Sequence, residues 1–224
     1  MKLLLFSGGG YFDNMRLMEE LVTMAFRKHP RILYIPSDGD DDDYYEDYTE
    51  FNMAINQVTK TETIYLPIDD KLTPHDFVQK LASSDGVFLS GGNTFHFLGH
   101  LRKKGLLSKL KLYARQGNLL SGLSAGAIIL TPSVETAGFP EFDCDINYDE
   151  ITNLRSLNLT RFLFFPHFKK SKRYSDAFRL ETLARTQYPI YCCPDYSGIK
   201  IFHNTVTFYG NCWGYFCGHE FRVN

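Results

Sequence analysis

This sequence of 224 residues has no long apolar run, a single tryptophan and almost no net charge. The first apolar stretch, Leu3–Phe6, ends at Ser7 and three glycines, so it is too short for a signal sequence or a membrane span. A formal net charge of −2 argues against a protein that holds nucleic acid on a broad basic surface. We therefore expect neither a membrane nor nucleic acid as a partner.

Cysteine is scarce and shows no metal-binding pattern. The five cysteines are odd in number and form no repeated short spacing, which is typical of reduced thiols in a cytoplasmic protein. His96 and His100 could share a helix face, but the glutamate of the HExxH zinc motif is missing, so we expect surface or packing roles for them. The Walker A and dinucleotide glycine patterns are missing as well. We expect no metal and no organic cofactor.

Short apolar runs alternate with longer amphipathic segments over the first 130 residues. Five runs bounded by Gly, Pro, Ser or Asp are predicted to be buried strands: Lys2–Phe6, Arg31–Ile35, Thr63–Leu66, Gly86–Leu89 and Leu119–Ser121. The intervening periodicity predicts helices over Asp13–Phe26, Asp76–Ala82, Leu106–Arg115 and Ala125–Leu130. This alternation is typical of an α/β fold with a mostly parallel central sheet and helices on both faces.

The last third of the chain has a different pattern. It predicts one helix, Ser175–Arg185, and four strands: Phe162–Phe165, Ile190–Cys193, Gly198–Phe202 and Thr205–Tyr209. The last two strands flank His203-Asn204 and resemble a hairpin. We expect a small antiparallel C-terminal extension and one domain over residues 1–224. The acidic stretch Asp38–Asp47 is interpreted as a solvated loop, because it lacks the spacing of a calcium loop.

Gly122-Leu123-Ser124-Ala125-Gly126 has the pattern of a nucleophile elbow. It follows a predicted strand and precedes a predicted helix, so the serine hydroxyl would lie above the sheet edge, at a helix N-terminus. The flanking glycines suit such a sharp turn, because they carry no side chains that would collide. The alternative is a plain glycine turn in which Ser124 caps the helix.

A second glycine segment, Ser90–Phe95, also follows a predicted strand and precedes a helical stretch. In a parallel sheet the two segments would meet at the carboxyl edge, where ligand sites form. The backbone N–H groups of Gly92 and Ala125 could then form an oxyanion hole with two donors. The alternative is a phosphate-binding loop or a plain turn.

A serine nucleophile needs a base and an acid that orients the base. Among the seven histidines, His167 follows an apolar strand and Pro166, which would bring it to the same edge as Ser124. Asp195 follows another apolar run and Pro194 and is the favoured acid. The rival acids lie in the loop after the elbow helix: Glu141, Asp143, Asp145 and Asp149.

These motifs together resemble the aspartyl dipeptidase (peptidase E) family of serine peptidases, with cyanophycinases as more distant relatives. The resemblance is carried by Ser90–Phe95, by Gly122–Ala127 and by Pro166-His167-Phe168. It implies a fold like that of class I glutamine amidotransferases and a triad of Ser124, His167 and Asp195, where the best-known members have Glu in place of the aspartate. The family's acidic loop residue aligns with Phe139, so Glu141 or Asp143 is a candidate replacement.

The resemblance also indicates how a substrate would be held. Asn93, Thr94 and Glu141 are candidate substrate-binding residues, and Arg173 or Arg179 could bind a substrate carboxylate through a planar guanidinium. The leading hypothesis is a cytoplasmic exopeptidase, monomeric or homodimeric, that acts on short peptides, among them peptides with an N-terminal Asp. Two alternatives stay open: a non-catalytic binding or regulatory protein, and an esterase or amidase for other substrates.

Overall fold

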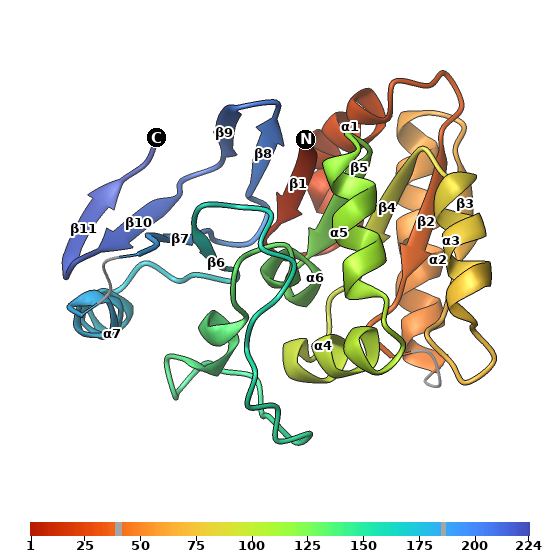
Figure 1. Ribbon diagram of the computed structural model, residues 1–224. Helices are drawn as coiled ribbons and strands as arrows, with labels where there is room; N and C mark the ends of the chain where they lie inside the picture. Colours follow the sequence, from red (N-terminus) through yellow and green to blue (C-terminus); the bar gives the residue numbers. More distant parts are fainter. Residues whose placement is uncertain (39–41, 185–186) are drawn as a thin grey trace.

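A computed structural model describes residues 1–38, 42–184 and 187–224 of the chain, with side chains omitted at 42–44. A seven-stranded sheet forms its centre, in the strand order β3-β2-β4-β5-β1-β8-β9 (Figure 1). Its first five strands are parallel, and their bounds are β1 Lys2–Phe6, β2 Arg31–Ile35, β3 Glu62–Tyr65, β4 Gly86–Leu89 and β5 Leu119–Leu123. The hairpin predicted around His203-Asn204 is confirmed as β8 (Gly198–Phe202) and β9 (Thr205–Tyr209), which add antiparallel to β1.

Helices cover both faces of this sheet, as the sequence predicts (Figure 1). Strand side chains alternate between the faces: Leu4 and Phe6 of β1 pack with α1 and α2, while Leu3 and Leu5 pack on the other side. The first face is covered by α1 (Met15–Ala25, after a 3-10 turn at Tyr11–Asn14) and α2 (Asp42–Val58). The second is covered by α3 (Pro74–Ala82), α4 (Thr94–Lys103), α5 (Leu107–Arg115) and α6 (Ala125–Ile129).

The acidic stretch is where the prediction and the structure differ most. Residues 42–47 open helix α2 and do not form a loop; residues 39–41 lie outside the described part of the chain. Acidic side chains are favourable in the first turn of a helix, where they meet the positive end of its dipole. Further along α2, Phe51, Ala54 and Ile55 are buried against the sheet and hold the helix in place. Asp47 accepts hydrogen bonds from the hydroxyls of Tyr11 and Tyr34.

A second sheet of four strands lies beside the first, in the order β11-β10-β7-β6 (Figure 1). Its bounds are β6 Leu163–Phe165, β7 Ile190–Cys192, β10 Trp213–Phe216 and β11 His219–Arg222. It is antiparallel except for the pairing of β6 with β7, which is parallel. Strands β10 and β11 are not among the strands that the sequence pattern predicts. Helix α7 (Lys172–Thr182) packs on this sheet and begins three residues before its predicted start, because Ser171 caps it.

The two sheets share one apolar core. A single cluster of buried side chains includes Leu5 of the central sheet and Phe164 of the second sheet. This common core is consistent with one domain over residues 1–224, which stays a prediction. Within the described residues, no helix combines the length and the apolar character needed to cross a membrane.

Candidate active site

Ser124 is the one residue between β5 and α6. Its backbone has φ 50° and ψ −109°, a conformation that costs free energy for a residue with a side chain. The neighbouring glycines make the turn possible. A Cβ at Gly122 would lie 2.4 Å from the carbonyl carbon of Gly126, and one at Gly126 would lie 2.4 Å from the backbone oxygen of Leu89. The turn thus has the sharpness that the elbow pattern predicts.

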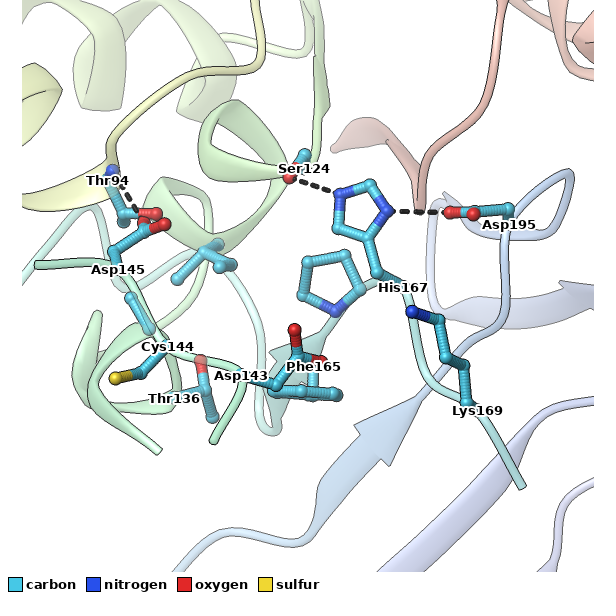
Figure 2. A pocket seen from close by; sticks show the side chains of 13 residues that line it. Thr94, Ser124, Thr136, Asp143, Cys144, Asp145, Phe165, His167, Lys169 and Asp195 are labelled. Atoms are coloured by element: carbon cyan, nitrogen blue, oxygen red, sulfur yellow. Dashed lines mark hydrogen bonds and ion pairs between the residues drawn. The ribbon is translucent and has the colours of Figure 1, made fainter. Parts of the chain in front are cut away.

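Three predicted residues form a continuous hydrogen-bonded line (Figure 2). The Oγ of Ser124 lies 2.8 Å from Nε2 of His167, and Nδ1 of His167 lies 2.6 Å from Oδ1 of Asp195. Ser124 comes from the end of β5 in the central sheet, whereas His167 and Asp195 follow β6 and β7 in the second sheet. With its proton on Nδ1 facing Asp195, His167 presents a lone pair on Nε2 to the Ser124 hydroxyl.

The rival acids have other partners. Asp143 accepts a hydrogen bond of 2.6 Å from the Tyr174 hydroxyl, and Asp145 accepts one of 2.8 Å from the Thr94 N–H. Asp149 pairs with His96 at 2.9 Å. Glu141 is exposed. Among these acids and Asp195, the structure brings only Asp195 into contact with His167 in the described part of the chain.

The turn after β1 supports this line through hydrogen bonds, a role that the sequence pattern does not predict. The backbone N–H of His167 donates to Oγ of Ser7 over 2.9 Å, and that hydroxyl donates to the Cys193 carbonyl over 2.6 Å. His167 needs this support because its φ of 57° is in the left-handed region. A Cβ at Gly8 would lie 2.2 Å from Cε1 of His167 and 2.3 Å from Oδ1 of Asp195. Only glycine fits there.

A pocket of about 290 Å³ opens next to Ser124 and His167. Groups of both charges line it: Asp143 lies on one side of the space beside His167 and Lys169 on the other (Figure 2). Thr94 also lines the pocket, and its buried Oγ1 has no hydrogen-bond partner among the described residues. The pKa of the Tyr174 hydroxyl that binds Asp143 is raised to about 12, by burial first and then by this carboxylate. Tyr174 therefore remains a hydrogen-bond donor at neutral pH.

The other predicted substrate residues are not among the described residues that line this pocket. The side chain of Asn93 caps α4 and donates to the Ile146 carbonyl. The Arg173 guanidinium stacks over the Phe142 ring at 3.6 Å, and Arg179 pairs with Glu220. Neither arginine, nor Glu141, is among the described residues that line the pocket. Lys169, which lies nearer to His167 in sequence, is the basic residue in the wall.

The two predicted oxyanion donors belong to adjoining segments. Ala125 begins α6, and the Gly126 N–H donates to the Ser90 carbonyl over 3.0 Å, which ties the elbow to the second glycine segment. Gly92 has a φ of 121°, a value that favours glycine. A Cβ at Gly91 would lie 3.8 Å from Cβ of Ser124. The Ser90–Phe95 segment therefore lies beside the elbow.

This arrangement is typical of serine-type hydrolases. In that class a strained turn after a strand carries the serine nucleophile, beside a histidine that is paired with an acid. Within that class the chain belongs to peptidase family S51, whose family model matches residues 3–208. This membership makes the protein a serine-type peptidase.

Individual relatives agree with this assignment. The chain is 27% identical over 183 residues to YgaJ, an uncharacterized peptidase of Bacillus subtilis (strain 168), across 80% of this chain and 74% of that protein. It is 30% identical over 128 residues to peptidase E of Shigella flexneri, across 55% of this chain but only about half (49%) of the relative.

Solved structures share the fold. A peptidase from an acI-B1 Actinobacterium matches with a TM-score of 0.75 at 17% identity, across 100% of this chain and 93% of that chain. A structure from Listeria monocytogenes EGD-e matches with a TM-score of 0.72 at 23% identity, across 92% of this chain and 96% of that chain. Identities this low show the fold alone.

Proposed function

We propose that the protein is an exopeptidase for short peptides, with peptides that begin with Asp as the first candidates. The observation that carries this proposal is the line from Ser124 through His167 to Asp195 in the wall of a small pocket. A cytoplasmic location and a monomeric or homodimeric state remain predictions from the sequence.

The reaction follows from the roles that these atoms can take. Nε2 of His167 takes the proton of the Ser124 hydroxyl while Oγ attacks the scissile carbonyl carbon. The N–H groups of Gly92 and Ala125 bind the oxygen that becomes negative. His167 then gives its proton to the leaving amine, and water, activated in the same way, releases the acyl group. Asp195 keeps the imidazole in the productive tautomer and stabilises its charged form.

The pocket supports a short, doubly charged substrate. Its volume of about 290 Å³ is at the lower end of the range for small-molecule sites, which leaves room for one residue and little more. The carboxylate of Asp143 suits a free N-terminal ammonium group, and the Lys169 ammonium suits a substrate carboxylate. In this proposal Lys169 takes the place that the sequence assigned to Arg173 or Arg179. Oγ1 of Thr94 offers a further hydrogen bond.

A labelling experiment tests the nucleophile. A fluorophosphonate probe should label the wild type and fail to label Ser124→Ala, since the probe reacts with an activated serine. Equal labelling of the wild type and of Ser124→Ala would contradict the proposal.

A substrate panel tests the specificity, with Asp-X dipeptides, their N-acetylated forms and p-nitrophenyl esters. We expect hydrolysis of the free dipeptides and loss of rate on acetylation, because acetylation removes the ammonium group. Cleavage of esters alone would indicate an esterase. A folded protein that hydrolyses nothing in the panel would favour a non-catalytic role.

A further inference from the structure

A second group of reactive side chains lies on helix α4, beside the Ser124 pocket but outside the described residues that line it. His96 and His100 are one turn apart on this helix, with ring centroids 4.0 Å from each other. Asp38, which follows β2, joins them. Nitrogen and carboxylate atoms of the three residues all lie within 4.8 Å of one another. Two imidazoles and one carboxylate thus converge on one point.

Two ring nitrogens of this cluster, one on each histidine, lack hydrogen bonds among the described residues. Nε2 of His96 and Nδ1 of His100 are buried, and neither has a hydrogen-bond partner in the described part of the chain. The Asp38 Oδ2 atom lies 3.3 Å from His96 Nε2 in an ion-pair contact that does not meet hydrogen-bond geometry. A buried polar atom without a hydrogen-bond partner costs free energy. A bound ligand would satisfy the two imidazole nitrogens and remove this cost.

Asp149 orients one of the two imidazoles. Its Oδ2 lies 2.9 Å from Nδ1 of His96, on the side of the ring opposite Nε2. A proton on Nδ1 that is donated to this carboxylate leaves the lone pair on Nε2, which faces Asp38. Metal-binding histidines are commonly held in this way, with the second ring nitrogen bonded to a carboxylate.

We propose that Asp38, His96 and His100 bind one divalent transition-metal ion, with Zn²⁺ as the ion that fits best. Two imidazole nitrogens and a carboxylate oxygen are a donor set that zinc takes in proteins, with water in the fourth position. Magnesium and calcium prefer sites made of oxygen atoms. The ion can reach the cluster from solvent, because the side chains of His96 and Asp38 are 33% and 32% exposed.

This ion would connect three segments that surround the pocket. Asp38 extends from β2, His96 and His100 belong to α4, and Asp149 belongs to the loop that also carries Asp143 and Asp145. Helix α4 begins at Thr94, whose N–H binds Asp145. A metal ion here therefore holds the pocket wall in place and takes no part in peptide hydrolysis itself. The inference stands whether or not the proposed exopeptidase activity is found.

Calorimetry tests the proposal directly. The full chain, stripped with a chelator, is titrated with ZnCl₂, and we expect one ion to bind per chain. Replacing both imidazoles, His96→Ala with His100→Ala, should abolish this binding. Asp149→Asn should weaken it about 10- to 100-fold, the usual loss for a residue that orients a ligand. His75→Ala is the matched control, because His75 is an exposed histidine that contacts Gln79 on α3.

Two results would overturn the proposal. One is a wild-type chain that binds no zinc. The other is zinc binding that survives in the double histidine variant and disappears in Cys144→Ser, since Cys144 is an exposed free thiol near the pocket. Thermal unfolding gives a second readout that shows the variants are folded. Zinc should raise the Tm of the wild type and of His75→Ala, and leave that of the double variant unchanged.

Discussion

At the scale of single residues, the Ser7 hydroxyl connects the backbone of His167 to that of Cys193, two residues before Asp195. Ser7→Ala removes both hydrogen bonds and leaves the part-buried His167 N–H without its partner, at a cost of about 1–3 kcal/mol, while the Cys193 carbonyl keeps the hydrogen bond from the Phe168 N–H. His167 then loses its anchor next to the nucleophile. We expect kcat to fall about 10- to 100-fold with little change in KM, because a displacement of about 1 Å can cost 100-fold. Steady-state kinetics on the best substrate of the panel measures this.

Ser121→Ala is the control for that experiment. The Ser121 hydroxyl is also buried and donates to the Val87 carbonyl over 2.8 Å, on a part of β5 that does not contact His167. It should lower stability and leave kcat unchanged. Equal effects of the two variants on kcat would show that Ser7 acts through stability alone.

The sequence predicts the position of some site residues and not of others. Ser124, His167 and Asp195 each follow a strand, so local pattern was enough to place them near one another. Ser7 touches His167 across 160 positions, and nothing in the local pattern around Ser7 points to that contact. Gly8 is recognisable only from the contacts that a side chain there would make.

At the scale of elements, the elbow depends on how closely α6 approaches β4. Gly126→Ala would place a Cβ 2.4 Å from the backbone oxygen of Leu89, which cannot move without moving the strand. Such overpacking costs about 1–3 kcal/mol, and each kcal/mol lowers the Tm by about 2–4 °C in a chain of this size. We also expect loss of fluorophosphonate labelling, since Ser124 would shift. Differential scanning calorimetry and the probe measure the two effects.

Gly138→Ala is the matched glycine for that variant. Its Cβ would make an ordinary contact of 3.6 Å with the Phe95 ring. It should keep both the Tm and the labelling. A Gly126→Ala protein that behaved in the same way would mean that the elbow tolerates a side chain.

Some helices and strands could be predicted from the sequence, and others could not. The strands of the parallel sheet are short apolar runs between turn residues, and the alternation with helices predicts their arrangement. Helix α2 begins in a run of acidic residues, whose composition resembles a loop, and the apolar side chains that hold it come later, from Phe51 onward. Whether β6 and β7 join the central sheet or a separate one depends on long-range pairing with β10, which local pattern does not encode.

At the scale of the whole molecule, two glutamates connect distant elements and make stability depend on pH. Glu20 of α1 accepts hydrogen bonds from Lys200 and Tyr209, and Glu220 of β11 pairs with Lys170 and Arg179. Burial raises both pKa values, but the hydrogen bonds outweigh it and leave each pKa below its ordinary value. A lowered pKa in the folded state stabilises the protein above about pH 4.3 and loses this effect as pH falls further.

The pH dependence leads to a test on stability. The Tm of the wild type should drop between about pH 5 and pH 3, and a Glu20→Gln/Glu220→Gln variant should have a lower Tm at pH 7 and a smaller drop, because it has less charge-dependent stability to lose. Glu19→Gln, which changes an exposed neighbour on α1, should follow the wild type. The Tm of each variant, measured by thermal unfolding across this pH range, tests these expectations. A double variant whose Tm coincides with that of the wild type at every pH would mean that these contacts, although they connect both sheets to their helices, contribute nothing to stability.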